Sequence, residues 1–409
     1  MVGFTSAMMV YSAYVFIGRF CVDMIRRREN AGGTRGTGIA LLIVFVILWL
    51  WMVWAYAKVV FTSPGYARDY VSKSNRPMFP EPPIPFIPYD NIVENSRSPA
   101  RPLHSTGPLR DMDQESIGGP SYENLPVRQP VDISKPAMVN NVARAETNEQ
   151  DSRNSSPRKP ELVYTRHENP ADYLHRRPLM TPILRPEYRY CEVDRIVKPY
   201  RTHHCRSCGT CILKYDHHCP WIGQCVGARN QKFFMNFIQV TSFLTTYTCV
   251  TLLVFVVLRA TSADGHIDPQ KIVIVAFAGL FAVFTTLMQF THVRLIWSGQ
   301  TTVESMQGHR MKHREKQAMN DVIGYWAILA KRRKTRSYDE EWGRIGREGN
   351  IWWLGSGKKG WVDVMGYNVW GWFLPIGKSL NDGLTYPVNP RFDAQGIWRK
   401  RAEWPRELR

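Results

Sequence analysis

The residues best suited to chemistry lie in one short segment, where cysteines and histidines alternate closely. Six of the eight cysteines fall between Cys191 and Cys225, and four histidines are interleaved with them. Two overlapping C-x-x-C pairs join positions 205 and 208 and positions 208 and 211. Thiolate and imidazole favour tetrahedral zinc, and this spacing lets one turn present two ligands. A secreted disulfide framework would usually spread its cysteines and omit histidine, so we expect zinc in a reducing compartment.

The segment holds more potential ligands than two zinc sites require. A closed zinc site takes four ligands, so two sites need eight. The segment offers six cysteines and four histidines, with Asp194 as an oxygen candidate. A surplus cysteine beside a histidine and an aspartate, in the field of two metal ions, could be an activated nucleophile. The cations favour its thiolate, the histidine acts as base, and the aspartate holds the histidine tautomer.

Four apolar stretches flank this segment and must position it. Residues 39–57, 233–258 and 272–292 carry no charged side chain and are long enough to cross a bilayer as helices. Residues 1–18 are also uncharged. We interpret them as a first spanning helix and not as a secretory signal, because the basic run 26–28 follows the apolar stretch instead of preceding it. A nucleophile at the membrane surface could meet the activated carbonyl of an acyl chain held among such helices.

The charge pattern indicates the partner and the orientation. The formal net charge is +18, and no base-reading or RNA-binding signature accompanies it, so we expect an anionic lipid leaflet and no nucleic acid. Lysine and arginine crowd both the segment between the second and third helices and the C-terminal tail, which places both in the cytoplasm. The basic run 26–28 then falls on the far side, against the rule. Either the rule is overridden here, or the first helix does not fully cross the bilayer. We keep four spans because the larger basic regions outweigh this one triplet.

Two further regions carry no chemistry of their own. Residues 62–187 are rich in proline, serine, asparagine and arginine without helical or strand periodicity, which predicts a disordered linker. The tail contains five tryptophans close together, at positions 352, 353, 361, 370 and 372. We expect part of this tail to pack on the cysteine-rich segment or to lie at the lipid interface.

The order of residues in the segment carries a family resemblance. Asp216-His217-His218-Cys219, inside a cysteine-rich loop between the second and third of four helices, resembles the DHHC protein palmitoyltransferases, which are named for that tetrapeptide. The likeness covers Cys191 to about Phe237. Residues 301–304 (TTVE) look like the TTxE motif of the family. Residues 360–366 (GWVDVMG) look like its C-terminal motif, with Met365 where an aromatic residue is usual.

The resemblance implies a role for each residue of the segment. One zinc ion would be held by Cys191, Asp194, His204 and Cys211, and the other by Cys205, Cys208, His218 and Cys225. Cys219 remains as the nucleophile, with His217 as base and Asp216 as its orienting partner. Asp194 stands where the family has a sulfur, so either its carboxylate ligates zinc or that site has three ligands.

The resemblance also implies contacts around the nucleophile. Lys198, Arg201 and His203 resemble positions that meet the phosphates of coenzyme A, and cationic side chains suit an anionic ligand. Thr302 and Glu304 would support the Asp216 side of the site.

The fold class that we predict is an α-helical integral membrane protein, with four transmembrane helices and a zinc-binding cysteine-rich cytoplasmic module. The expected order is helices 1 and 2 in residues 1–61, the disordered cytoplasmic linker 62–187, the zinc domain 188–232, helices 3 and 4 in 233–297, and a cytoplasmic C-terminal region 298–409. The resemblance implies a protein S-acyltransferase of the endomembrane system (endoplasmic reticulum, Golgi or vacuole). It would move a long-chain acyl group from acyl-CoA through acyl-Cys219 to cysteines of substrate proteins at the membrane.

Two rival functions were considered. A membrane scaffold whose zinc module only recruits partners would need both zinc sites, but not Asp216, His217 and Cys219 together. A transporter or channel would be expected to carry charges or broken helices within its spans, and the apolar stretches show neither.

Overall fold

The computed structural model describes residues 1–27, 33–78, 174–262 and 267–409. These residues belong to one compact unit, Met1–Pro80 with Glu168–Arg409. Most of the segment predicted to be a disordered linker, residues 79–173, lies outside the described residues.

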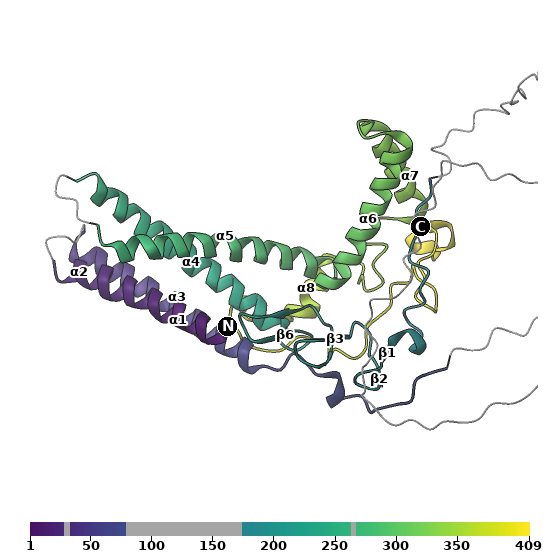
Figure 1. The fold of residues 1–409 in the computed structure, drawn as a ribbon, viewed down its shortest axis with the longest axis horizontal. Coiled ribbons are helices and arrows are strands. Elements are labelled where there is room, and N and C mark those ends of the chain that lie inside the picture. The colour runs from purple at the N-terminus through teal and green to yellow at the C-terminus, as the bar shows by residue number, and fades with distance from the viewer. Residues whose placement is uncertain (28–32, 79–173, 263–266) are drawn as a thin grey trace, which may run out of the picture. The chain divides into compact units, whose positions relative to one another are not determined.

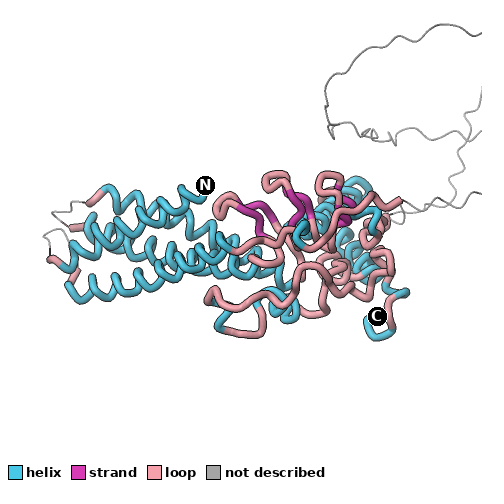
Figure 2. The backbone as a smooth tube through the Cα atoms, turned by 90° about the horizontal axis from the view of Figure 1, so that it is seen from below, coloured by secondary structure: helices cyan, strands magenta, loops and turns pink. Residues whose placement is uncertain are grey.

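Four long helical segments dominate the described part of the chain. The first joins α1 (Val2–Ala13), the π-helix η1 (Tyr14–Cys21) and α2 (Val22–Ile25). The others are α3 (Arg35–Phe61), α4 (Gln231–Ala260) and α5 (Pro269–Trp297). All four are long and apolar enough to cross a membrane, and they lie side by side (Figures 1 and 2). The predicted class of four membrane helices with a cysteine- and histidine-rich module is confirmed.

Local sequence explains where these helices begin and how they pack. The Thr34 hydroxyl accepts a hydrogen bond from the Thr37 N–H before α3, and the Asp268 carboxylate caps α5, whose first residue is proline. Inside the bundle, the rings of Phe16 and Phe45 stack with centroids 4.2 Å apart. Apolar side chains also cover the outside of the bundle, as lipid-facing surfaces require.

The cysteine-rich module consists of three short antiparallel hairpins at one end of the helices (Figure 2). β1 (Tyr190–Cys191) pairs with β2 (Ile196–Val197), β3 (His203–Cys205) with β4 (Thr210–Ile212), and β5 (His217–Cys219) with β6 (Gln224–Val226). Glycines with φ of 63° and 69°, at positions 209 and 223, close the last two hairpins in the left-handed conformation that turns of this kind require. Strands of two or three residues bury little apolar surface, so the module needs another source of stability.

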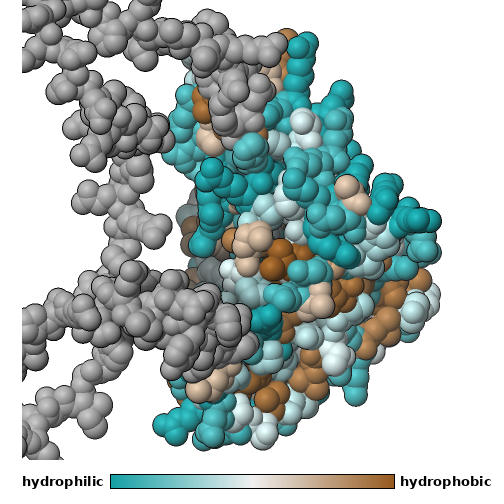
Figure 3. Space-filling model, turned by 90° about the vertical axis from the view of Figure 1, so that its right-hand side faces the viewer, coloured by the Kyte–Doolittle hydropathy of each residue, from teal (hydrophilic) through white to brown (hydrophobic). Residues whose placement is uncertain are grey.

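The C-terminal region contains α6 (Thr302–Ile323), α7 (Ile328–Trp342), α8 (Gly357–Met365) and α9 (Trp370–Phe373). Short 3-10 helices complete the description: η2 (Ala67–Asp69), η5 (Pro186–Arg189), η6 (Arg401–Glu403) and η7 (Arg406–Leu408). Helix α8 packs so closely on the end of α5 that a Cβ on Gly360 would lie 2.5 Å from the Ile296 carbonyl oxygen. The surface at the end that carries α6 and α7 is largely hydrophilic, with smaller apolar areas between (Figure 3).

The described ends of the 62–187 segment depart from the disorder expected of them. Tyr66 forms a β-bridge with Ile212, and Ala67 is fully buried beneath the module. At the other end, the Arg176 side chain is buried and pairs with Glu315 at 2.7 Å and with Asp339 at 3.1 Å. Specific contacts therefore order both ends, which composition alone could not indicate.

The tryptophan-rich tail divides into buried and exposed parts. Trp352 is buried, with its ring centroid 5.5 Å from that of Tyr200, at the edge of the cysteine-rich module. Trp361 and Trp372 pack against the bundle core, whereas Trp370 is exposed. Packing on the module, the first of the two expected placements, is thus observed for Trp352.

Candidate active site and metal clusters

Two groups of four side chains converge within the hairpins. In the first, potential ligand atoms of Cys191, Asp194, His204 and Cys211 all lie within 4.8 Å of one another, and in the second those of Cys205, Cys208, His218 and Cys225 do so. The register of the hairpins produces this grouping, because His204 faces Cys211 across β3–β4 and His218 faces Cys225 across β5–β6. The β3–β4 hairpin therefore contributes to both groups and ties the three hairpins together.

The distances in the second group suit a tetrahedral zinc ion. The His218 Nδ1 atom lies 3.7, 3.5 and 3.6 Å from the Sγ atoms of Cys205, Cys208 and Cys225. Zinc–sulfur and zinc–nitrogen bonds of ordinary length place neighbouring ligand atoms roughly 3.5–3.8 Å apart in a tetrahedron. The three sulfurs and one imidazole nitrogen thus fit the metal without rearrangement.

The first group substitutes a carboxylate for one sulfur. Asp194 Oδ1 lies 3.1 Å from His204 Nδ1, which in turn lies 3.7 Å from Cys191 Sγ. The other carboxylate oxygen accepts hydrogen bonds from the Cys211 N–H at 2.6 Å and from the Thr210 hydroxyl at 3.2 Å. The backbone therefore holds one oxygen and turns the other toward the cluster, which is compatible with a zinc ligand.

On strand β5, a side chain of the second cluster and a cysteine outside both clusters point to opposite faces. Side chains alternate between the two faces of a strand, so His217 and Cys219 share one face while His218 points to the other. His218 accordingly joins the second cluster, and Cys219 belongs to neither cluster. Of the six cysteines in the segment, Cys219 is the one left with its sulfur free of both groups.

A hydrogen-bonded network stands beside Cys219. The His217 Nδ1 atom donates to Asp216 Oδ2 at 2.6 Å, and Asp216 is fully buried. Burial alone would raise the pKa of Asp216, but hydrogen bonds from His217 and from the Thr302 N–H outweigh it and lower that pKa. Burial would lower the pKa of His217, but Asp216 and Cys219 outweigh it and raise that pKa to about 9. The arrangement favours the protonated imidazolium of His217 beside the Cys219 sulfur.

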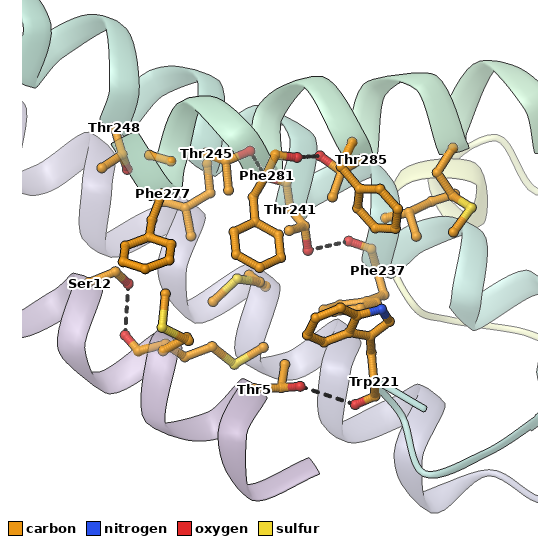
Figure 4. Close-up of a pocket in the computed structure, with 18 of the residues that line it drawn as sticks. Thr5, Ser12, Trp221, Phe237, Thr241, Thr245, Thr248, Phe277, Phe281 and Thr285 are labelled. Atoms are coloured by element: carbon orange, nitrogen blue, oxygen red, sulfur yellow. Dashed lines mark hydrogen bonds between the residues drawn. The ribbon is translucent and has the colours of Figure 1, made fainter. Parts of the chain in front are cut away.

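The other side of Cys219 opens on an apolar cavity of about 140 Å³ between the membrane helices. Phe277 and Phe281 of α5 project into it from one side, opposite Thr5 and Ser12 of α1 and beside Trp221 (Figure 4). Several hydroxyl groups on its wall donate within their own helices. Thr241, for example, donates to the Phe237 carbonyl and Thr285 to the Phe281 carbonyl, each at 2.7 Å. The cavity therefore suits a hydrocarbon chain.

The residues expected to meet coenzyme A phosphates differ in their availability. The side chain of Arg201 is only 3% exposed, and its guanidinium donates to both oxygens of Glu304 at 2.7 Å. Its charge is paired and its Nε and Nη2 atoms already donate, to Glu304 and to the Gly299 carbonyl, so the phosphate contact expected of Arg201 stays a prediction. Lys198 and His203 remain partly exposed. Burial lowers the pKa of His203, which favours its neutral form.

The start of α6 braces the network. Thr302 donates through its N–H to Asp216 Oδ1 at 2.9 Å and through its hydroxyl to the Asp216 backbone oxygen. Thr301 and Glu304 form a reciprocal capping box at the same helix end. Thr302 thus lies on the Asp216 side as expected, while Glu304 acts through the cap and through Arg201.

Sequence reasoning missed His292 near the end of α5. Its ring centroid lies 5.7 Å from that of His217, and its ring nitrogen belongs to a cluster with Asp216 and His217 whose atoms lie within 4.8 Å. Among the described residues its Nδ1 atom has no hydrogen-bond partner. The sequence did contain a signal, because a histidine stands in an otherwise apolar run. An ionisable side chain in a membrane-spanning segment costs free energy, so it usually marks a functional site.

Comparison with known proteins connects this geometry to a family. Residues 185–309 match the family model described as DHHC palmitoyltransferase. The chain is 34% identical to palmitoyltransferase PFA3 of Saccharomyces cerevisiae over 239 residues, which cover 55% of this chain and 64% of that protein. It is 27% identical to palmitoyltransferase ZDHHC15 of Xenopus laevis, covering 56% and 60%. It is 29% identical to palmitoyltransferase PFA3 of Debaryomyces hansenii, covering 95% and 81%.

The chain thus spans less than two thirds of the length of the Saccharomyces cerevisiae and Xenopus laevis relatives. The family-model match, residues 185–309, covers the three hairpins, α4, α5 and the start of α6. On this match and on the geometry of the hairpins, the chain carries a DHHC palmitoyltransferase domain at residues 185–309.

Proposed function

We propose that this protein is an S-acyltransferase that moves a long-chain fatty acyl group from acyl-CoA to cysteines of substrate proteins, through a thioester on Cys219. One observation carries the proposal. The buried Cys219 side chain lies between the Asp216–His217 pair on one side and an apolar cavity on the other. A nucleophile with a base beside it and space for hydrocarbon next to it is what acyl transfer at a membrane surface requires.

In the first step, the thiolate of Cys219 attacks the carbonyl carbon of the acyl-CoA thioester. The bond between this carbon and the sulfur of coenzyme A breaks, and coenzyme A leaves as a thiolate. His217 holds the proton taken from Cys219 and gives it to the leaving sulfur, while Asp216 fixes the ring and stabilises its positive charge. The acyl chain would lie in the cavity beside Phe277 and Phe281.

In the second step, a cysteine of a substrate protein attacks the acyl-Cys219 thioester. His217 accepts the proton of the incoming thiol, and Cys219 is released for another cycle. Both steps exchange one thioester for another, so the reaction needs no oxidant and no other co-reactant. Lys198 is the favoured contact for the coenzyme A phosphates, since Arg201 is committed to Glu304.

We also propose that both clusters hold zinc, with Asp194 as the fourth ligand of the first. When bound, zinc would supply the folding energy that such short hairpins lack and a positive field near Cys219. The protein would lie in the membrane of an endomembrane compartment, with the hairpins and the C-terminal region on the cytoplasmic side. The distribution of lysine and arginine favours this orientation.

A chase experiment tests the two steps separately. The purified protein in detergent is loaded with labelled palmitoyl-CoA, freed of excess substrate, and mixed with a cysteine peptide attached to a lipid anchor. The proposal expects label on the protein that hydroxylamine removes, followed by transfer to the peptide. Protein that never takes up label would contradict the enzyme assignment and favour the scaffold alternative.

A further inference from the structure

A second cavity lies on the outer flank of α5, away from Cys219. It has a volume of about 720 Å³ and is bounded by the last turns of α5, one face of α6, the loop at residues 344–347 and the start of α8. Ligand sites commonly enclose about 300–1,000 Å³, so the cavity has room for a molecule the size of a phospholipid headgroup.

Among the described residues that line this cavity, every ionisable side chain is basic. They are Arg294, His309, Lys312, Arg344 and Arg347, from three separate segments. Within the described part of the chain, the side chains of Arg294, Lys312 and Arg344 form no ion pair. Several uncompensated cations around one hollow create a strong positive potential, which favours an anion there.

The cavity continues an apolar stripe on the lipid-facing side of α5. Leu280, Val283, Leu287 and Phe290 are 65%, 62%, 63% and 70% exposed, and they recur at the spacing of one helix face. The same face reaches Arg294 at the cavity. Trp297, the last residue of α5, is half exposed and lines the cavity, as expected of a side chain at a membrane interface. The apolar stripe thus leads from the bilayer core into a basic hollow.

This face is separate from the proposed active site. His292, which contacts His217, lies on another side of α5, about 100° around the helix from Thr291. Cys219 lines the apolar cavity between the helices and not this basic one.

We propose that the basic cavity binds the phosphorylated headgroup of an anionic membrane lipid, whose acyl chains lie along the Leu280–Phe290 stripe. A free phosphate or the phosphates of coenzyme A would pair with the cations but would make no contact with the apolar stripe. The combination of both features in one continuous surface favours a lipid. Binding would fasten the end of α5 and the start of α8 to the leaflet next to the cysteine-rich module.

The test measures lipid binding to the full chain purified in detergent. Native mass spectrometry follows adducts of a short-chain phosphatidylinositol bisphosphate, with short-chain phosphatidylcholine as the uncharged reference. The site variant is Lys312→Gln/Arg344→Gln. The control is Arg310→Gln/Arg333→Gln, which removes the same charge from exposed positions on α6 and α7 outside the cavity. Thermal unfolding without lipid checks that both variants are folded.

The parent and the control should bind the phosphoinositide more tightly than phosphatidylcholine, and the site variant should bind it roughly tenfold more weakly or worse. Neither inorganic phosphate nor coenzyme A at the same concentration should displace it. Equal binding by the site variant and the parent would overturn the proposal, as would an equal loss in the control. Displacement by inorganic phosphate would reduce the site to a general anion site. Displacement by coenzyme A would assign it to the co-substrate. Either result would refute the lipid while leaving the acyltransferase proposal standing.

Discussion

At the scale of residues, neighbours in sequence serve different sites. His218 and Cys219 are adjacent, yet one faces a metal cluster and the other faces the membrane cavity, because strand side chains alternate. Basic side chains that are close in sequence also differ in their surroundings. Arg201 is buried against Glu304, whereas Lys198, three positions earlier in the sequence, stays partly exposed.

Asp194 offers a test at this scale. If its carboxylate ligates zinc, Asp194→Ala should release one of two zinc ions faster than the parent during challenge with a chelator. Asp194→Cys should hold both ions more tightly, because a thiolate is the softer ligand. Metal content is followed by mass spectrometry. An alanine variant that keeps both ions as long as the parent would end the ligand assignment.

Arg201 offers a second test, which separates structure from co-substrate binding. Arg201→Met would leave Glu304 buried without its partner, so we expect a loss of about 3–5 kcal/mol in the free energy of unfolding. Arg201→Met/Glu304→Leu should recover part of this loss but not all of it, because it also removes the capping bond from the Thr301 N–H to Glu304. Lys198→Met should change KM for acyl-CoA with little effect on stability. If Arg201→Met instead unfolds like the parent but has a raised KM for acyl-CoA, this result would favour a contact between Arg201 and the coenzyme A phosphates.

At the scale of elements, the hairpin register decides which ligands share a metal. Cys208→Ala or His218→Ala should lower zinc content and thermal stability together, since metal binding is folding energy in so small a module. Cys249→Ala is the matched control, because this cysteine lies in α4 outside both clusters. Loss of stability without loss of zinc would show that these residues are ordinary core and not ligands.

Helix α6 supplies another test at this scale. Thr302→Val removes the hydroxyl bond to the Asp216 backbone while keeping the N–H bond to its carboxylate. A lost hydrogen bond of about 1 kcal/mol corresponds to acyl-enzyme formation roughly fivefold slower. Thr261→Val removes a similar hydroxyl at the far end of α4 and should leave the rate unchanged. Equal rates for Thr302→Val and the parent would remove α6 from the account of the site.

The elements also show how far the sequence could lead. Four uncharged stretches predicted the four membrane helices, because the bilayer constrains length and polarity strongly. The assignment of ligands to two clusters came from a family resemblance, since spacing alone does not give the register of β3–β4 and β5–β6. The burial of Arg201, the place of His292 and the docking of Arg176 depend on contacts between residues that are at least 75 positions apart along the chain, which no local pattern encodes.

At the scale of the whole molecule, the bundle and the module meet at Cys219. The helices supply an apolar cavity, the hairpins and α6 supply the charged network, and Cys219, the proposed nucleophile, lies where the two adjoin. Separation of these parts would leave either a hydrocarbon cavity without chemistry or a reactive thiol without its acyl chain. The function is therefore a property of the assembled chain.

The central claim is tested most directly by identifying the covalent intermediate and the residue that carries it. The parent and Cys219→Ser, each purified in detergent, are mixed with palmitoyl-CoA and examined by intact mass, peptide mapping and zinc analysis. We predict one hydroxylamine-sensitive palmitoyl group on Cys219 in the parent and none on the variant, with equal zinc content and melting temperature in both. Acylation that persists in Cys219→Ser, or loss of zinc from that variant, would contradict the central claim.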